Sequence, residues 1–143
     1  MASFDDIAQR VLDRIASEPD PFAALADDAL FDELARAVFA FQYEANPPYR
    51  AFCERRGRTP ATVTRWQDVP ALPTTAFKSV DLACAPADKV FRTSGTTEGG
   101  DRRGRHLIPR PEIYRRGALA HFRRMVLADG IRPRVVGLLG SPD

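Results

Sequence analysis

The sequence has few of the residues that support several common kinds of protein site. Its two cysteines, Cys53 and Cys84, stand alone, with neither a CxxC motif nor histidines at ligand spacing, which gives little support to a zinc site or a disulfide framework. No apolar run approaches the ~20 residues that a membrane helix needs. The acidic start Met1–Asp6 lacks the basic and apolar regions of a secretory signal. We therefore expect a cytoplasmic protein with two buried or incidental thiols.

The formal net charge of +2 conceals an uneven distribution of charge along the chain. Ten acidic residues stand against three arginines before residue 45, whereas eleven arginines stand against five acidic residues from residue 92 onward. Such a basic half suits a polyanion, either a triphosphate or a nucleic acid. The alternative is a solvated helix face whose arginines pair with the acidic half. The composition, 44% hydrophobic and 28% charged, indicates one soluble domain or a piece of one.

Residues 1–57 have the pattern of a helical N-terminal segment. Ser3 can cap a first helix that Pro19 ends, and a second helix is expected from about Asp27 to Ala45. Asn46 can cap a short third helix that closes at Gly57. The apolar face of the second helix is expected to pack in the core rather than to form a ligand groove; it consists of Leu30, Leu34, Val38 and Phe41.

The remainder divides into an extended Pro- and Thr-rich connector, residues 58–88, and the start of an α/β domain, residues 89–143. In the second part, Val90–Arg92 and Arg105–Ile108 have strand composition and could pair as a hairpin or lie as adjacent strands. A helix should follow Pro111, with His121 on a face that packs in the core. The apolar run Val135–Leu139 is typical of a strand buried in a parallel sheet, and would complete a βαβ unit.

A run of hydroxyl residues and glycines, at residues 93–100, separates the two strand-like segments. Glycines let backbone N–H groups approach an anion, and Ser and Thr hydroxyls donate to phosphate oxygens. The run lacks the Lys-Ser/Thr ending of a Walker A loop, because Asp101 and Arg102 follow Gly100. The pattern therefore indicates a phosphate-binding loop of another type, or alternatively a mobile glycine-rich hairpin turn.

The residues around this loop resemble the N-terminal part of the LuxE-type acyl-protein synthetases, which belong to the adenylate-forming (AMP-forming) ligases. The resemblance spans roughly Asn46 to the C-terminus and is most specific at Thr93–Thr97. Glu98 stands where that family usually has a glycine. The other segments that carry the resemblance are Trp66–Pro73, Phe77-Lys78, Gly104–His106 and Pro111–Tyr114.

The resemblance implies an ATP-dependent enzyme that activates a carboxylic acid, such as a long-chain fatty acid, as an acyl-adenylate and passes it to an acceptor protein or thiol. It implies Mg²⁺ beside ATP, and an α/β fold in which N-terminal helices precede the first strands and helix of a larger mixed or parallel sheet. The family's later motifs have no counterpart here, so we expect the N-terminal part of a longer enzyme, inactive alone. The ATP-binding residues so implied are Thr93, Ser94, Gly95, Thr96, Thr97, Gly99, Gly100, Arg103 and Arg105.

Two other functions compete with this hypothesis. The arginine-rich half could make the chain a nucleic-acid-binding or interaction module, although its arginines match no named DNA-reading motif and lack interleaved aromatic residues. The chain could also be an inactive remnant of a ligase. We expect no membrane partner, and we rank nucleic acid below ATP and a small carboxylic acid.

Overall fold

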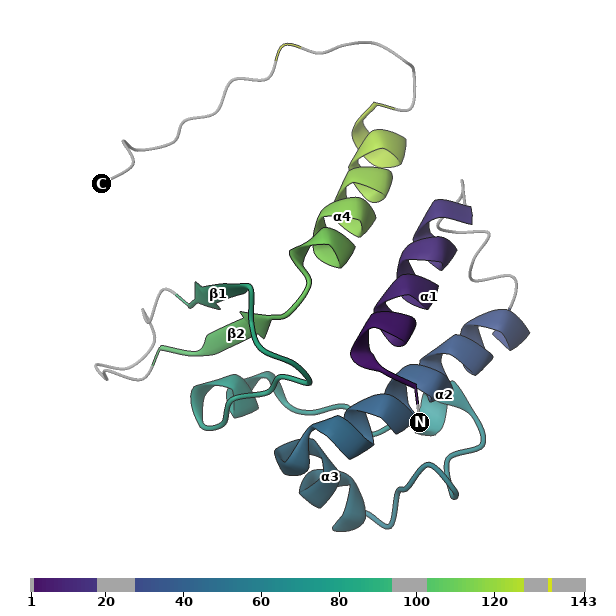
Figure 1. The fold of residues 1–143 in the computed structure, drawn as a ribbon, viewed down its shortest axis with the longest axis vertical. Coiled ribbons are helices and arrows are strands. Elements are labelled where there is room, and N and C mark those ends of the chain that lie inside the picture. The colour runs from purple at the N-terminus through teal and green to yellow at the C-terminus, as the bar shows by residue number, and fades with distance from the viewer. Residues whose placement is uncertain (1, 18–27, 94–102, 128–133, 135–143) are drawn as a thin grey trace.

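The computed structural model describes residues 2–17, 28–93, 103–127 and 134 of the 143-residue chain. These residues form a mixed arrangement of four α-helices and a two-stranded antiparallel sheet. In Figure 1, α1 lies between α2 and α4, and the sheet lies on the far side of α4 from α1. In the described part of the chain, no helix has the length and apolar character needed to cross a bilayer.

Helix α1, Phe4–Ser17, begins at a reciprocal cap. The Asp6 amide donates to Ser3 Oγ at 3.1 Å, and the Ser3 amide donates to Asp6 Oδ2 at 2.9 Å. The bond from the Ser3 amide, followed by the Ser3 side chain, lowers the pKa of the Asp6 carboxyl. The buried face of the helix is Ile7, Ala8 and Leu12, so the amphipathic pattern seen in the sequence produces a packed helix.

The main core lies between α2, Asp28–Ala45, and α3, Pro47–Glu54. Phe39 on α2 is 1% exposed, and Cys53 on α3 is fully buried. The cluster is completed by Tyr43, Tyr49 and Val63. The prediction for α2 was therefore right about the helix and wrong about its most deeply buried face, because Phe39 and Tyr43, four residues apart, pack on α3.

The face of α2 that the sequence analysis placed in the core is only partly covered. Leu30 is 44% exposed. Val38 and Phe41 are half-buried and line a cavity described below. A helix of 18 residues has room for two apolar faces. The spacing of apolar residues along the sequence does not by itself say which face packs against another element.

Helix α3 begins as its sequence predicts, and it ends at Glu54, three residues before Gly57. The Asn46 side chain accepts a hydrogen bond from the Tyr49 amide at 3.1 Å, and prolines fill the first turn, where no amide donor is needed. After the helix, Gly57 takes φ +63°, and its amide donates to Glu54 O at 2.9 Å. Glycine adopts this left-handed conformation without a Cβ penalty, so it ends the helix cleanly.

The connector is mostly irregular, with two short 3₁₀ helices, η2 at Trp66–Asp68 and η3 at Thr74–Lys78. Two hydrogen bonds attach its first part to the helices. The Tyr49 hydroxyl donates to Pro70 O at 2.8 Å, and the Trp66 amide donates to Asp32 Oδ1 at 2.6 Å. The connector is thereby held against α2 and α3.

Strands β1, Lys89–Arg92, and β2, Arg105–Ile108, pair antiparallel, which confirms the hairpin alternative. Helix α4, Pro111–Val126, follows the hairpin. Its apolar face is not in the core as expected: His121 is exposed, and Tyr114 is 70% exposed. Helix α4 approaches α1 through Gly117, where an added Cβ would lie 3.8 Å from Ile15.

The wider sheet and the βαβ unit stay predictions. Their third element, the run at residues 135–139, lies outside the described residues. The two-stranded hairpin and α4 by themselves do not establish an adenylate-forming fold.

Candidate functional site

The ends of the hydroxyl- and glycine-rich segment meet at a pair of hydrogen bonds beyond the last strand pair. The Thr93 amide donates to Gly104 O at 3.0 Å, and the Gly104 amide donates back to Thr93 Oγ1 at 2.9 Å. We call Thr93, Gly104 and the flanking Arg92, Arg103 and Arg105 the hairpin neck. The Thr93 side chain thus has a defined structural task, which is to close the neck.

The position of Gly104 leaves little room for a side chain. A Cβ built there would lie 3.3 Å from Thr93 Cγ2 and 3.5 Å from the carbonyl oxygen of Phe77. The residue is buried although its neighbours Arg103 and Arg105 are exposed. A glycine at this position lets the chain ends approach each other and pack on η3.

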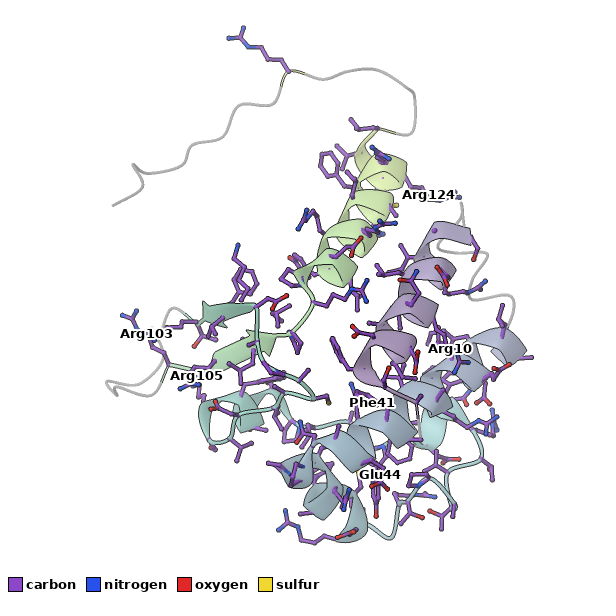
Figure 2. The ribbon with its side chains drawn as sticks, viewed as in Figure 1. Arg10, Phe41, Glu44, Arg103, Arg105 and Arg124 are labelled. Carbon is purple, nitrogen blue, oxygen red and sulfur yellow. The ribbon has the colours of Figure 1, made fainter. Side chains whose placement is uncertain are left out.

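The hairpin register brings positive charges together at the neck. Arg92 on β1 pairs directly with Arg105 on β2, so both side chains leave the same face of the sheet. Like charges directly opposite each other in an antiparallel pair are destabilising. Arg103 also lies at this end of the hairpin, as Figure 2 shows. The neck is therefore a concentration of guanidinium groups that an anion would stabilise.

One of these arginines already has a carboxylate partner. Arg105 Nη2 lies 2.9 Å from Asp81 Oδ2 in the connector, and both side chains are about half exposed, at 49% and 56%. A pair so exposed to solvent contributes little to stability. Arg103 and Arg92 form no ion pair with other residues in the described ranges, so their donors remain available to a ligand.

Aromatic stacking joins the neck to the connector. The Phe77 ring on η3 lies against the His106 ring on β2, with centroids 4.3 Å apart and planes tilted by 32°. The carbonyl of the same Phe77 lies beside Gly104. His106 is half-buried against this ring.

Most of the sequence-predicted phosphate-binding residues lie outside the described part of the chain. This applies to Ser94, Gly95, Thr96, Thr97, Gly99 and Gly100. Thr93, Arg103 and Arg105 are described, and they lie together at the neck.

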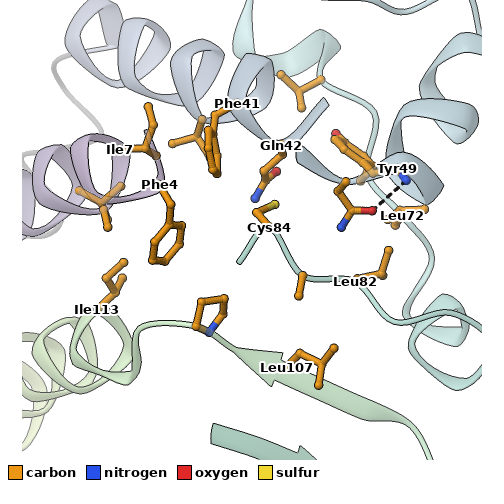
Figure 3. A pocket seen from close by; sticks show the side chains of 18 of the residues that line it. Phe4, Ile7, Phe41, Gln42, Tyr49, Leu72, Leu82, Cys84, Leu107 and Ile113 are labelled. Carbon is orange, nitrogen blue, oxygen red and sulfur yellow. Dashed lines mark hydrogen bonds between the residues drawn. The ribbon is translucent and has the colours of Figure 1, made fainter. Parts of the chain in front are cut away.

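A large apolar cavity lies on the other side of Phe77. It has a volume of about 670 Å³, is partly open to solvent, and is bordered by α1, α2, α3, the connector, β2 and the first turn of α4 (Figure 3). Phe4 and Phe41 face it from α1 and α2, with ring centroids 6.2 Å apart, and Leu107 faces it from β2. Its wall is almost entirely aliphatic and aromatic, so the cavity favours an apolar occupant.

Four side chains with polar atoms line the cavity, namely Gln42, Asn46, Tyr49 and Cys84. Asn46 Oδ1 caps α3 by accepting from the Tyr49 amide. Burial raises the pKa of Cys84, and the neighbouring Asn46 side chain opposes that shift in part. The Cys84 thiol therefore stays protonated at neutral pH. This agrees with the expectation from the sequence that Cys84 is a buried or incidental thiol. The Tyr49 hydroxyl is satisfied by Pro70.

Sequence reasoning missed Arg92, Gly104, Phe77 and the cavity. The first two were visible in principle, because pairing the two strands antiparallel places Arg92 opposite Arg105 and Gly104 beside Thr93. The cavity had no local signal, since its wall is assembled from residues between positions 4 and 113.

Comparison with known proteins gives one informative similarity. A long-chain-fatty-acid–luciferin-component ligase from Vibrio harveyi is 32% identical to this chain over 82 residues, which covers 55% of this chain and 21% of that protein. The match thus spans about a fifth of the relative's length. No family model and no solved structure matches the chain. The similarity supports a LuxE-like family at most.

Proposed function

We propose that the chain forms the ATP-binding part of an AMP-forming acyl-protein ligase. In this proposal the complete protein lets the carboxylate of a long-chain fatty acid attack the α-phosphate of ATP, so that pyrophosphate leaves and an acyl-adenylate forms; a thiol then takes the acyl group and AMP leaves. The similarity to the fatty-acid–luciferin-component ligase supports the ligase class. The site chemistry is argued from the hairpin neck.

The observation that carries the proposal is the register that sets Arg92 opposite Arg105 next to a hydroxyl- and glycine-rich segment. Two guanidinium groups on one face repel each other, and the exposed Asp81 carboxylate beside Arg105 offsets only part of this repulsion. Guanidinium forks match phosphate oxygens in geometry and charge. A triphosphate at the neck would convert this repulsion into charge-assisted hydrogen bonds.

Each neck residue then has a specific role. Arg92 and Arg103 would bind the β- and γ-phosphate oxygens and offset the negative charge that grows as pyrophosphate leaves. Arg105 would bind both the phosphate and Asp81, and the ion pair with Asp81 would fix the direction of the Arg105 side chain. Thr93 and Gly104 close the neck through their hydrogen bond. In this proposal the hydroxyl and amide groups of residues 94–100, between them in the sequence, donate hydrogen bonds to the phosphates.

The residues present fit a nucleotide better than they fit a metal on its own. The neck supplies three guanidinium groups, which suit phosphate. Among the described residues there is no group of three or more metal-ligating side chains. Mg²⁺ commonly binds through substrate phosphates and only one or two carboxylates, so it would arrive with ATP.

The proposal is tested by exchange of labelled pyrophosphate into ATP, measured on the complete protein that carries these residues. Saturated fatty acids and aryl acids are offered in turn, and exchange that depends on a fatty acid is the expected result. Absence of exchange with every carboxylate, in protein shown to be folded, would remove the ligase assignment.

A second measurement addresses the neck. Arg92→Gln should weaken ATP binding about tenfold or more, since charge-assisted bonds contribute about 1.5–3 kcal/mol. Arg115→Gln is the matched control, because it removes the same charge from an exposed position on α4. Equal loss in both variants would mean that ATP senses only overall charge. Thr96→Val and Thr97→Val should also lower affinity and turnover.

A further inference from the structure

The cavity behind Phe77 has the size and lining of a site for an aliphatic chain. Its volume is about 670 Å³, within the range of roughly 300–1,000 Å³ that small-molecule sites occupy. A methylene fills about the same volume as a water molecule, ~30 Å³, so a chain of about fourteen carbons needs roughly 400 Å³. We propose that this cavity binds the hydrocarbon chain of a fatty acid.

The chemistry of the wall favours a hydrocarbon over a polar ligand. Asn46 and Tyr49 have hydrogen-bond partners within the protein. Cys84 is a half-buried thiol whose pKa is raised by burial, and Gln42 adds one exposed amide at the wall. A polar ligand would lose its bonds to water and find few unsatisfied donors or acceptors in return, whereas an alkyl chain loses nothing by desolvation.

The position of the cavity relates it to the proposed ligase. Phe77 forms part of the cavity wall and also stacks on His106 of the strand that ends at the neck. Leu107, the next residue of that strand, faces the cavity (Figure 3). The inference rests on the proposed function for what the bound acid is used for, but binding of the chain itself requires neither ATP nor catalysis.

The test is a chain-length series without nucleotide. At ~30 Å³ per carbon, a cavity of about 670 Å³ is filled by about twenty-two carbons, so binding of saturated fatty acids from about eight to about twenty-six carbons is measured by calorimetry below their micelle concentrations. Affinity should rise about fourfold for each added methylene, from ~0.8 kcal/mol per buried methylene, and should stop rising once the cavity is full. A series that never levels off would indicate adsorption to the protein surface and would overturn the proposal.

A narrowing variant gives the sharper result. Ala83 lines the cavity, and Ala83→Phe adds six ring carbons to its half-buried wall position. In a close-packed site this should shorten the length at which affinity levels off by about four to six carbons. The matched control is Ala87→Phe in the same connector, where the alanine is exposed and does not line the cavity. An unchanged break point in Ala83→Phe would contradict the inference.

A second control addresses the other apolar surface. Phe122, on α4, is 43% exposed and lies outside the cavity. Phe122→Ser should leave the length series unchanged; if it abolishes binding, the acid binds on α4 and the proposal fails.

Bound acid should also slow maleimide labelling of Cys84 in the cavity wall, with Cys53 replaced by Ala to leave one thiol.

The two proposals can fail separately. Pyrophosphate exchange with a fatty acid but no length-limited binding would refute the cavity inference and leave the ligase intact. Length-limited binding without exchange would refute the ligase and leave the cavity as a lipid-binding site.

Discussion

The hydrogen bond from the Gly104 amide to Thr93 Oγ1 makes a quantitative prediction about the hairpin neck. Thr93→Val keeps the shape of the side chain and removes the oxygen that accepts this 2.9 Å bond. Because Gly104 is buried, its N–H has no direct access to water and should lose the full value of a hydrogen bond. We expect the neck to be weakened by about 1–3 kcal/mol.

Hydrogen exchange measures this effect most directly. The Thr93 amide bonds to Gly104 O, and that bond is not altered by the substitution. If the neck opens more often, exchange of this amide should accelerate by about five- to 150-fold, which is the same free energy expressed as an equilibrium constant. ATP affinity should fall in parallel if the neck holds phosphate.

Thr93→Ser is the control for loss of the methyl group, because it retains Oγ. It should exchange within about a few-fold of the unmodified protein. If Thr93→Val and Thr93→Ser exchange at the same rate, the hydroxyl does not close the neck and the reasoning is refuted.

Three further predictions concern the helical part of the chain. The hydrogen bond from Arg36, followed by the bond from the Trp66 amide, lowers the pKa of Asp32. The stabilisation of the fold by the ionised Asp32 carboxylate is therefore present above the ordinary Asp pKa near 4, and it is lost as pH falls through the lowered pKa. The difference in unfolding midpoint between wild type and Asp32→Asn should accordingly disappear at low pH. Gly57→Ala should cost about 1 kcal/mol in urea unfolding because of its positive φ alone, since nothing lies within 4 Å of the added Cβ. Tyr49→Phe removes the hydroxyl that donates to Pro70 O and should also lower the free energy of unfolding by about 1 kcal/mol. An unchanged urea midpoint in Gly57→Ala would contradict the argument from positive φ, and one in Tyr49→Phe would contradict the argument from this hydrogen bond.

Local signals in the sequence were sufficient for the helices and the hairpin. Asn46 followed by two prolines, and Gly57 at the end, specify a short helix through caps that involve only neighbouring residues. The hairpin alternative was likewise recognisable from two short apolar segments around a glycine-rich run. Boundaries of this kind depend on interactions within a few residues, so sequence reasoning can find them.

Which apolar face is buried could not be read in the same way. Helix α2 presents two apolar faces, and contact with α3 selected the one with Phe39 and Tyr43. Helix α4 has apolar residues that no described element covers, including Tyr114 and Met125. Which side chains of a helix are buried depends on the elements that pack against it, and the spacing of apolar residues within one helix does not reveal those elements.

The same limit separates the two proposed sites. Thr93, Arg103 and Arg105 of the neck were found because they lie close in sequence to a hydroxyl- and glycine-rich segment, whereas the cavity is assembled from side chains more than 100 positions apart. Phe77 is common to both, because it lines the cavity, stacks on His106 and has its carbonyl beside Gly104. An acid whose chain lay in the cavity would therefore have Phe77 as a neighbour in common with the neck. Activation of a carboxylate by ATP requires the two reactants to be held close together. This shared boundary is the physical reason to consider the cavity and the neck as parts of one site.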